Sequence, residues 1–300
     1  LHDVTASVER EDRIGIVGQN GAGKTTLLKI LTGEYQDYEG EFSVTHGVTL
    51  GYLEQNAKLD ATLDLYGEMR STFAPVLDAM AQMQVLERKM AAQPDDTELL
   101  ARHDQLQNIV DAADGYNMDV NIKKVLSGMG FAQDTWQKNI AVLSGGELTR
   151  LRLAKLLLEK PDVLILDEPT SQLDPIAAST FLHTLRKLNE ELGLTILLSE
   201  QRLEEAVPLA DHLIVLERGR LLASGAPRTA AAAVRSRPIF SAMPTAARIA
   251  AALGAPEHLP LTVREGRAYL QRFSPRPMPD ASPVPMDAPP VLTVRDGWLR

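Results

Sequence analysis

The sequence contains no cysteine among its 300 residues, which excludes a disulfide framework, a thiolate metal site and a cysteine nucleophile. It also has no apolar stretch approaching the roughly 20 uninterrupted residues that cross a bilayer. Its first residues lack the charged and then apolar pattern of a signal peptide. We therefore expect a soluble protein of the cytoplasm, with no transmembrane segment of its own.

Basic residues are in the minority, and the net charge of −9 argues against a protein that coats nucleic acid, because such binding needs a positive surface. The balance is uneven, since residues 229–300 hold nine Arg, no Lys and five acidic residues. Such a tail could contact RNA or anionic lipid, although we favour an ordinary solvated face. The hydrophobic content of 44% is ample for one large α/β domain with additions.

Short continuous apolar runs predict the buried strands of a parallel sheet that helices cover on both faces. They occur at residues 14–17, 163–166 and 195–198. A helix is expected after the first run, over 25–31. We also expect an edge strand from the alternation over 4–8, and a closing antiparallel hairpin over 213–223. The predicted fold class is therefore α/β with an antiparallel edge.

A second pattern, apolar residues at helical spacing, lies near the middle of the chain. It comprises Ala79, Met83, Leu86 and Met90, followed by Leu99, His103, Leu106, Val110 and Ala113. Pro94 separates the two runs, and Asp95 with Glu98 has the spacing of a capping box that opens the second helix. We predict an antiparallel helical hairpin of about 35 residues, in which Met and His on the shared seam are core residues and not ligands.

One segment between a predicted strand and a predicted helix fits the phosphate-binding pattern G-x-x-x-x-G-K-[ST]. It consists of Gly18, Gln19, Asn20, Gly21, Ala22, Gly23, Lys24 and Thr25, with Thr26 next in the helix. The glycines let backbone N–H groups face a β-phosphate, Lys24 reaches the β and γ oxygens, and Thr25 holds Mg²⁺. An ordinary glycine turn is the alternative, but the strand–turn–helix context favours a site for a nucleoside triphosphate such as ATP.

Two acidic residues follow the apolar run of Leu164–Leu166. A carboxylate at the carboxyl end of a buried strand can bind Mg²⁺, and the next one can polarise an attacking water. We assign Asp167 to the metal and Glu168 to the general base. Two acids in a solvated turn are the alternative, which is weak because the strand directs them to the sheet edge where ligands bind.

Leu143–Glu147 opens another predicted helix. Ser144 and Glu147 have capping-box spacing, so an ordinary helix start is one interpretation. Gly145 and Gly146 nonetheless expose N–H groups at the positive end of a helix, which is an anion site.

These three segments occur in the order found in ATP-binding cassette (ABC) proteins, and the sequence resembles that family over nearly its whole length. The resemblance implies a P-loop NTPase fold with a helical subdomain that carries the long hairpin. It also implies an ATP sandwich, in which the signature residues Ser144, Gly145, Gly146 and Glu147 of one cassette close over the γ-phosphate held by the P-loop of another.

The resemblance adds four residues to the expected site. Gln55 matches the family's Q-loop glutamine near Mg²⁺ and the attacking water, and Leu173 and Asp174 match its D-loop. Gln201 stands where a switch histidine is expected, and glutamine can hydrogen-bond a γ-phosphate but does not titrate near neutral pH, so we expect slow hydrolysis. The expected catalytic residues are Lys24, Gln55, Glu168 and Gln201, and the expected metal-binding residues are Thr25, Gln55 and Asp167.

The two halves of the chain resemble different branches of the family. Residues 1–170 resemble the ABC-F proteins, many of which act on ribosomes, and residues 171–290 resemble the ATPase of energy-coupling-factor (ECF) importers. The implied partners are a second cassette and either a membrane transporter subunit or the ribosome. We favour the transporter, which extends the expected location to the inner face of the cell membrane.

These observations divide the chain into an ABC nucleotide-binding domain and three later segments. We expect the domain over 1–228, with the helical subdomain and hairpin over about 56–142. The later segments are a small extension over 229–274, a proline-rich linker over 275–290 and the truncated start of a second ABC domain over 291–300.

Two rival functions differ in class from a cassette ATPase. One is an ATP-gated interaction module with little turnover, for which Gln201 is the best support. The other is a P-loop kinase that phosphorylates a small molecule, which does not explain the signature segment.

Overall fold

A computed structural model describes residues 1–53, 59–91, 93, 96–255 and 258–273 of the chain. A six-stranded sheet in the order β2-β3-β4-β1-β5-β6 lies at its centre. All neighbouring strands are parallel except β5 and β6, which pair antiparallel. The predicted α/β fold with an antiparallel edge is confirmed. The strands are β1 (Arg13–Val17), β2 (Leu50–Leu53), β3 (Val163–Asp167), β4 (Thr195–Glu200), β5 (His212–Glu217) and β6 (Arg220–Gly225).

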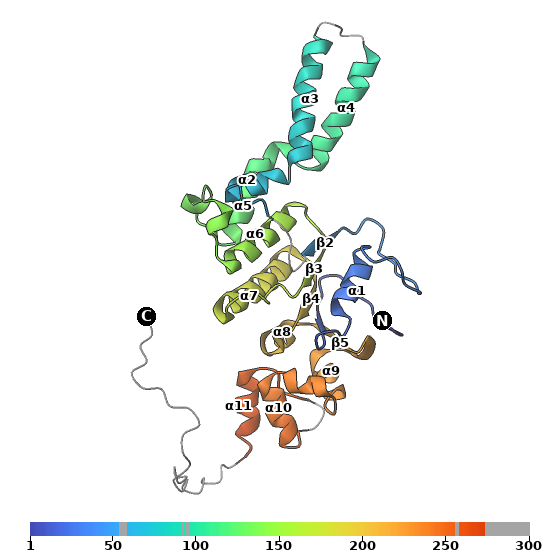
Figure 1. Cartoon of the computed structure of the whole chain (residues 1–300), viewed down its shortest axis with the longest axis vertical. Coiled ribbons are helices and arrows are strands. Elements are labelled where there is room, and N and C mark those ends of the chain that lie inside the picture. The colour runs from blue at the N-terminus through green and yellow to red at the C-terminus, as the bar shows by residue number, and fades with distance from the viewer. Residues whose placement is uncertain (54–58, 92, 94–95, 256–257, 274–300) are drawn as a thin grey trace, which may run out of the picture.

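Helices cover both faces of this sheet (Figure 1). Leu28 of α1 packs with Ile165 on one face, whereas Leu151 of α6 and Phe181 of α7 pack with Leu164 on the other, as the alternation of side chains along a strand requires. The helices are α1 (Lys24–Leu31), α2 (Leu65–Ser71), α3 (Ala74–Met90), α4 (Thr97–Ala112), α5 (Met118–Gly128), α6 (Gly145–Leu158), α7 (Pro175–Leu192), α8 (Leu203–Leu209), α9 (Pro227–Ala233), α10 (Thr245–Ala252) and α11 (Val263–Leu270). Short 3₁₀ turns lie at Gly115–Asn117, Gln133–Thr135, Ile140–Val142 and Pro238–Ala242.

The predicted helical hairpin is confirmed as α3 and α4, which project together from the rest of the molecule (Figure 1). Met83 and Leu106 are buried between them. Asp95 lies outside the described residues, and the residue that caps α4 is Asp96, whose carboxylate accepts from the N–H groups of Glu98 and Leu99 at 2.9 and 3.2 Å. The predicted position of the cap was therefore wrong by one residue.

The expected edge strand over residues 4–8 is absent from the structure, so that prediction was wrong. Only His2 makes a bridge to the sheet, opposite Arg220 of β6. The next residue, Asp3, has a φ of 51°, which turns the chain away from β6 before further ladder bonds can form. Val8 is consequently 41% exposed.

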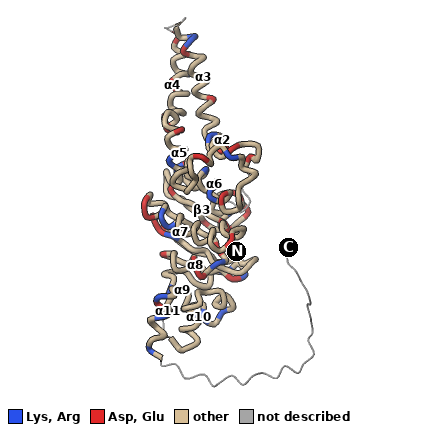
Figure 2. Tube along the Cα trace, turned by 90° about the vertical axis from the view of Figure 1, so that its left-hand side faces the viewer, with Lys and Arg blue, Asp and Glu red and all other residues tan. Residues whose placement is uncertain are grey.

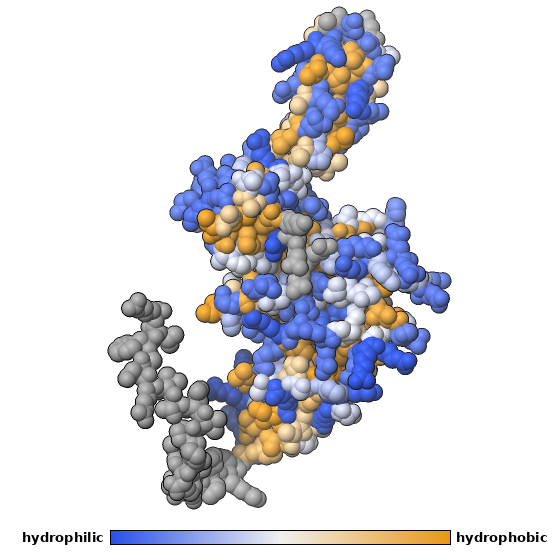
Figure 3. All heavy atoms as spheres, in the orientation of Figure 1, coloured by the Kyte–Doolittle hydropathy of each residue, from blue (hydrophilic) through white to orange (hydrophobic). Residues whose placement is uncertain are grey.

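The three C-terminal helices α9 to α11 share a core with the sheet. Their buried side chains, including Ala231 and Ala250, pack with Val207 and Val215 of α8 and β5. This unit leaves apolar residues exposed, including Ile249 of α10 at 43% and Leu253 just after it at 45%. Figure 3 shows an apolar patch at the base of the molecule, where Figure 1 places α9 to α11.

An ion pair between Arg228 of α9 and Glu265 of α11 ties this C-terminal unit together. The guanidinium donates to both carboxylate oxygens, at 2.6 and 3.1 Å. Glu265 also completes a capping box with Thr262. The hydrogen bonds from Arg228, followed by those from the backbone, lower the pKa of Glu265 from 4.5 to about 2.

We expect this carboxylate to make the stability of the C-terminal helices sensitive to acid. A pKa lowered by folding stabilises the folded state above the unfolded value near 4.5, and the contribution is lost as pH falls towards about 2. Glu265→Gln should lower the thermal midpoint of unfolding at pH 7. In this variant the midpoint should also decrease less than in the parent as pH falls from about 4.5 to about 2. The exposed Glu191→Gln is the matched control, and an equal flattening in both variants would contradict the assignment.

Candidate functional site

The glycine-rich loop over residues 18–25 connects β1 to α1 and wraps tightly. A Cβ on Gly18 would lie 2.6 Å from the carbonyl oxygen of Leu216, so no larger residue fits there without a shift. Gly23 has a φ of 101° and forms the left-handed N-cap of α1. The loop and the first turn of α1, where Thr25 and Thr26 are exposed, thus present backbone N–H groups at a helix N-terminus.

Lys24 is the first residue of α1, directly after these glycines, and is only 4% exposed. Its ammonium donates to the carbonyl oxygens of Gly18 at 3.0 Å and Gln19 at 3.4 Å. It also lies 3.1 Å from Oε1 of Glu168. A bound phosphate would therefore compete with these three oxygen atoms for the buried ammonium of Lys24.

Asp167 ends β3 beside β4, and Glu168 follows directly after the strand. The register places Ser199 opposite Asp167, and the serine hydroxyl donates to Oδ1 of Asp167 at 2.7 Å. Glu168 has a φ of 46°, a left-handed conformation that costs a non-glycine residue of order 1 kcal/mol or more. Its N–H donates to the carbonyl of Ser199 at 3.0 Å, which holds this strained turn in place.

Gln201 completes the surroundings of Glu168. Its side-chain amide donates to Oε2 of Glu168 at 2.6 Å, while Lys24 contacts Oε1. The structure therefore brings together Lys24, Asp167, Glu168 and Gln201 from three segments that are far apart in the sequence. Gln55 lies outside the described residues.

Sequence patterns did not identify two neighbours of this site, Ser199 and Glu200. Glu200 is 2% exposed and accepts from the N–H of Thr170 at 3.1 Å, and burial raises the pKa of its carboxyl group. Both residues end β4, so their roles follow from the pairing of β4 with β3, which the sequence alone does not give. Two polar residues directly after an apolar strand were the available signal.

Ser144 and Glu147 form the predicted capping box at the start of α6. Glu147 accepts from the N–H and the hydroxyl of Ser144 at 2.8 and 2.6 Å, which lowers the pKa of its carboxyl group. A Cβ on Gly145 would lie 3.3 Å from the carbonyl oxygen of Gln172, so this end of α6 packs closely on the segment before α7. Among the described residues, no hydrogen bond or ion pair joins the segment 144–147 to Lys24, Asp167 or Glu168.

The predicted D-loop residues have structural partners in this chain. Leu173 is buried, and its carbonyl accepts from the guanidinium of Arg202 at 2.7 Å. Asp174 caps α7 by accepting from the N–H groups of Ile176 and Ala177, both at 3.0 Å.

The donors available to a metal are oxygen atoms. Thr25 offers a hydroxyl in the first turn of α1, and Asp167 offers a carboxylate at the end of β3. Over the described ranges of the chain, no cluster of three or more His, Cys, Asp or Glu could hold a metal by itself. Such a sparse set fits Mg²⁺, which is held by one or two protein oxygens together with phosphates and water.

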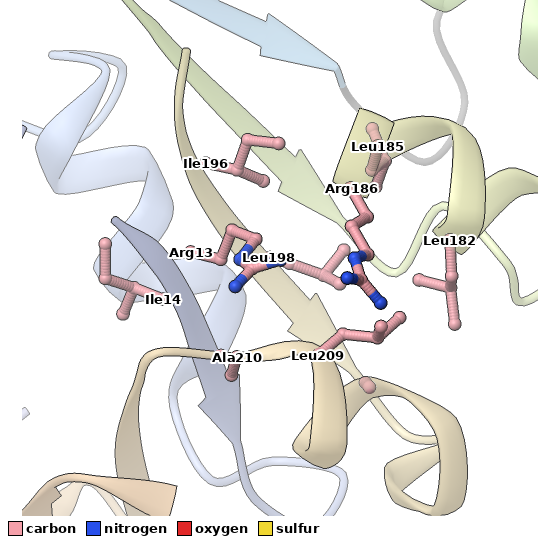
Figure 4. Close-up of a pocket in the computed structure, with 11 residues that line it drawn as sticks. Arg13, Ile14, Leu182, Leu185, Arg186, Ile196, Leu198, Leu209 and Ala210 are labelled. Atoms are coloured by element: carbon pink, nitrogen blue, oxygen red, sulfur yellow. The ribbon is translucent and has the colours of Figure 1, made fainter. Parts of the chain in front are cut away.

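A small hollow lies between α7, α8 and the sheet at β1 and β4 (Figure 4). Its volume is about 30 Å³, and Leu182, Leu185 and Leu209 line it. Such a volume holds about one water molecule, so this hollow is a packing feature and not a ligand site.

In the part of the chain that the structure describes, no helix combines the length and the apolar character that crossing a bilayer requires.

Residues 1–171 match a protein-family model described as ABC transporter. The match covers more than half of the chain and includes the glycine-rich loop, Ser144–Glu147 and Asp167. The predicted resemblance to ATP-binding cassette proteins is therefore confirmed.

Curated relatives include proteins named for transport and a protein named for translation. A protein named as an ABC transporter ATP-binding protein, from Bacillus thuringiensis subsp. konkukian, is 33% identical over 278 residues, which are 91% of this chain and 46% of that protein. The energy-dependent translational throttle protein EttA of Haemophilus influenzae is 36% identical over 188 residues, 61% of this chain and 33% of EttA. The chain thus spans about half or less of the length of these relatives. Because the first match covers 91% of the chain, it includes parts of both residues 1–170 and residues 171–290, the two halves that resemble different branches.

Solved structures show the same fold. The chain is similar to cbiO1 from Clostridium perfringens, described as part of the ABC transporter complex cbiONQ, with a TM-score of 0.54 and 20% identity over 80% of this chain and 89% of that one. It is also similar to a metal-chelate type ABC transporter, with a TM-score of 0.53 and 19% identity over 74% of each chain. These similarities support the P-loop α/β fold.

Proposed function

Because this chain belongs to the ABC transporter family, we propose that it binds Mg·ATP in the loop over residues 18–25 and hydrolyses it to drive a conformational change. The observation that carries this proposal is the convergence of Lys24 and Gln201 on the two carboxylate oxygens of Glu168. A general base must be held in place by partners that leave it able to take a proton from water. Equilibrium titration with Mg·ATP and measurement of phosphate release test the proposal.

In the proposed reaction, the residues of this chain bind the nucleotide and orient the attacking water. The loop N–H groups and Lys24 hold the β- and γ-phosphates, Thr25 and Asp167 hold Mg²⁺, and Glu168 takes the proton of the water. Magnesium supplies charge neutralisation at the phosphates when it is bound. The proposed metal site also includes Gln55.

A second cassette is the partner that we propose for Ser144–Glu147. Among the described residues, no hydrogen bond or ion pair joins this segment to Lys24, and exposed apolar side chains lie close to it in the chain. Val142 is 73% exposed just before Ser144, and Ile176 is 80% exposed just after Asp174. A facing cassette would cover both side chains while its γ-phosphate meets the N–H groups of α6.

For the whole protein, we propose the role of ATP-binding component of an ABC transporter of the ECF type, in the cytoplasm at the inner face of the membrane. The relative matched over 91% of the chain bears an ABC transporter name, and the cbiO1 fold covers 80% of the chain. We propose the domain boundaries given above with this role. Co-purification of the full protein with a membrane subunit tests this role. Recovery of the full protein from the membrane fraction without any membrane subunit would contradict it.

An ABC-F factor acting on the ribosome is the second candidate, favoured by the α3–α4 hairpin and the similarity to EttA. The charge of the hairpin weighs against direct contact with ribosomal RNA. Residues 74–113 hold only Arg88, Lys89 and Arg102 as cations against seven acidic residues, and Figure 2 shows no continuous basic stripe along them. ATP-dependent sedimentation of the full protein with ribosomes would favour this candidate.

Slow hydrolysis is a further part of the proposal, because Gln201 stands at the expected switch position. We expect Gln201→His to raise kcat about tenfold, equivalent to about 1.4 kcal/mol of transition-state stabilisation, with a smaller change in ATP affinity. The imidazole can keep the bond to Glu168 and adds a titratable donor. An unchanged kcat in this variant, with hydrolysis still dependent on Glu168, would show that position 201 is not the switch.

A further inference from the structure

A cavity of about 610 Å³ opens at the amino ends of β3 and β4. Val163 and Thr195, the first residues of these strands, lie in its lining. Asp167 lies at the other end of β3, four residues and therefore about 13 Å further along the strand. The cavity shares no lining residue with the nucleotide site. It lies at the amino ends of the strands, and the nucleotide site lies at their carboxyl ends.

The floor of the cavity is apolar. It is formed by Val125 of α5 and Met129 directly after this helix, by Leu157 and Leu158 of α6, and by Leu188 of α7. The volume falls within the range of about 300–1,000 Å³ that is usual for small-molecule sites with apolar walls and a few polar groups. It is far larger than the voids that remain between packed elements.

The basic side chains around the cavity differ in their partners. Lys187 lies 3.7 Å from Glu191, and Lys160 lies 3.6 Å from Asp114, so both are ion-paired. Lys124 forms no ion pair with any residue that the structure describes. Arg10, which also lines the cavity, likewise forms no ion pair with a described residue. A ligand can therefore engage either cation without breaking an existing pair, and Lys124 is the one that stands on α5 next to Val125 of the apolar floor.

The acidic side chains are mostly engaged already. Oδ2 of Asp162 accepts from both the N–H and the hydroxyl of Thr49 at 2.8 Å. Glu191 is paired with Lys187, whereas Glu11, the third acid of the lining, makes no ion pair with a described residue. The lining holds four cations against three acids, so its own net charge is positive.

We propose that this cavity binds an amphiphilic organic anion, a small molecule with an apolar body and one carboxylate or sulfonate group. The apolar body occupies the floor between α5, α6 and α7, and the anionic group pairs with Lys124. Three elements, α6, β3 and α7, connect the cavity with Ser144, Asp167 and Asp174 at their other ends.

The test is an equilibrium titration with 8-anilinonaphthalene-1-sulfonate, followed by its fluorescence. We expect one saturable site per chain, displaced by decanoate but not by decylamine, because the two competitors share an apolar chain and differ in charge. Saturating Mg·ATP should leave probe binding in place, because the two sites share no residue. Displacement of the probe by Mg·ATP would overturn the cavity proposal. A separate titration with Mg·ATP alone tests nucleotide binding, so the two proposals can fail independently.

Two variants with matched controls locate the probe. Lys124→Glu should weaken binding about fivefold or more, whereas Lys123→Glu, the same change on an exposed neighbour outside the lining, should not. Leu192→Glu, at a cavity residue that is 60% exposed, should weaken it similarly. Ile249→Glu, on the apolar surface of α10, is its control.

Both cavity variants alter exposed residues, so they are expected to fold. Equal binding by all four variants and the parent protein would place the probe elsewhere and overturn the proposal. So would a loss of binding in the controls alone, or displacement by decylamine as effective as that by decanoate.

Discussion

Lys24→Ala is expected to weaken the binding of Mg·ATP about 30- to 150-fold, corresponding to the loss of about 2–3 kcal/mol of charge-assisted hydrogen bonding. The reason lies in the position of the side chain. Lys24 is 4% exposed, and its ammonium lies within the loop that the phosphates must contact, 3.1 Å from Glu168. Calorimetric titration of the full protein measures this effect directly.

Lys29→Ala is the matched control for Lys24→Ala. Lys29 lies on the same helix, but its side chain is 44% exposed and pairs with Glu34 at 3.6 Å. Its removal should leave nucleotide affinity within about twofold of the parent, because exposed pairs contribute little. Equal affinities in both variants would show that the loop over residues 18–25 is not the nucleotide site.

Glu168→Gln is expected to lower the rate of hydrolysis at least about 100-fold while ATP still binds, because removal of a general base costs about 10²- to 10⁴-fold. The glutamine has the same shape and can keep a contact with Gln201, so closure over the nucleotide survives. In the full protein, ATP should therefore trap a closed pair of cassettes, detectable as a compact species by analytical ultracentrifugation.

Glu159→Gln supplies the control for this second variant. Glu159 is exposed at the end of α6, and no described hydrogen bond or ion pair joins it to the loop over residues 18–25. The Glu159→Gln variant should therefore hydrolyse ATP at the rate of the parent protein. If the Glu168→Gln variant retained more than about a tenth of the parent rate, Glu168 would not be the base.

Local patterns were enough to predict the glycine-rich loop, the α3–α4 hairpin and the buried strands. Each depends on residues close together in the chain, where spacing determines the structure. The contact between Ser199 and Asp167 depends instead on which strands pair, and the sheet order β2-β3-β4-β1 is not written in any one segment. The ion pair of Arg228 with Glu265 escaped prediction for the same reason.

The failed edge strand over residues 4–8 shows the limit of alternation as a signal. The pattern was correct for a strand, but the left-handed turn at Asp3 removes the partner that pairing needs. The large cavity could not be predicted either, because its lining comes from α5, α6, α7 and the starts of two strands.

Steady-state phosphate release by the full protein at saturating Mg·ATP tests the central claim most directly. We expect continuous multiple-turnover release that falls to background in Glu168→Gln, which identifies an ATPase whose chemistry runs through the carboxylate held by Lys24 and Gln201. Release from the parent protein no faster than from Glu168→Gln would contradict this claim and favour an ATP-gated interaction module.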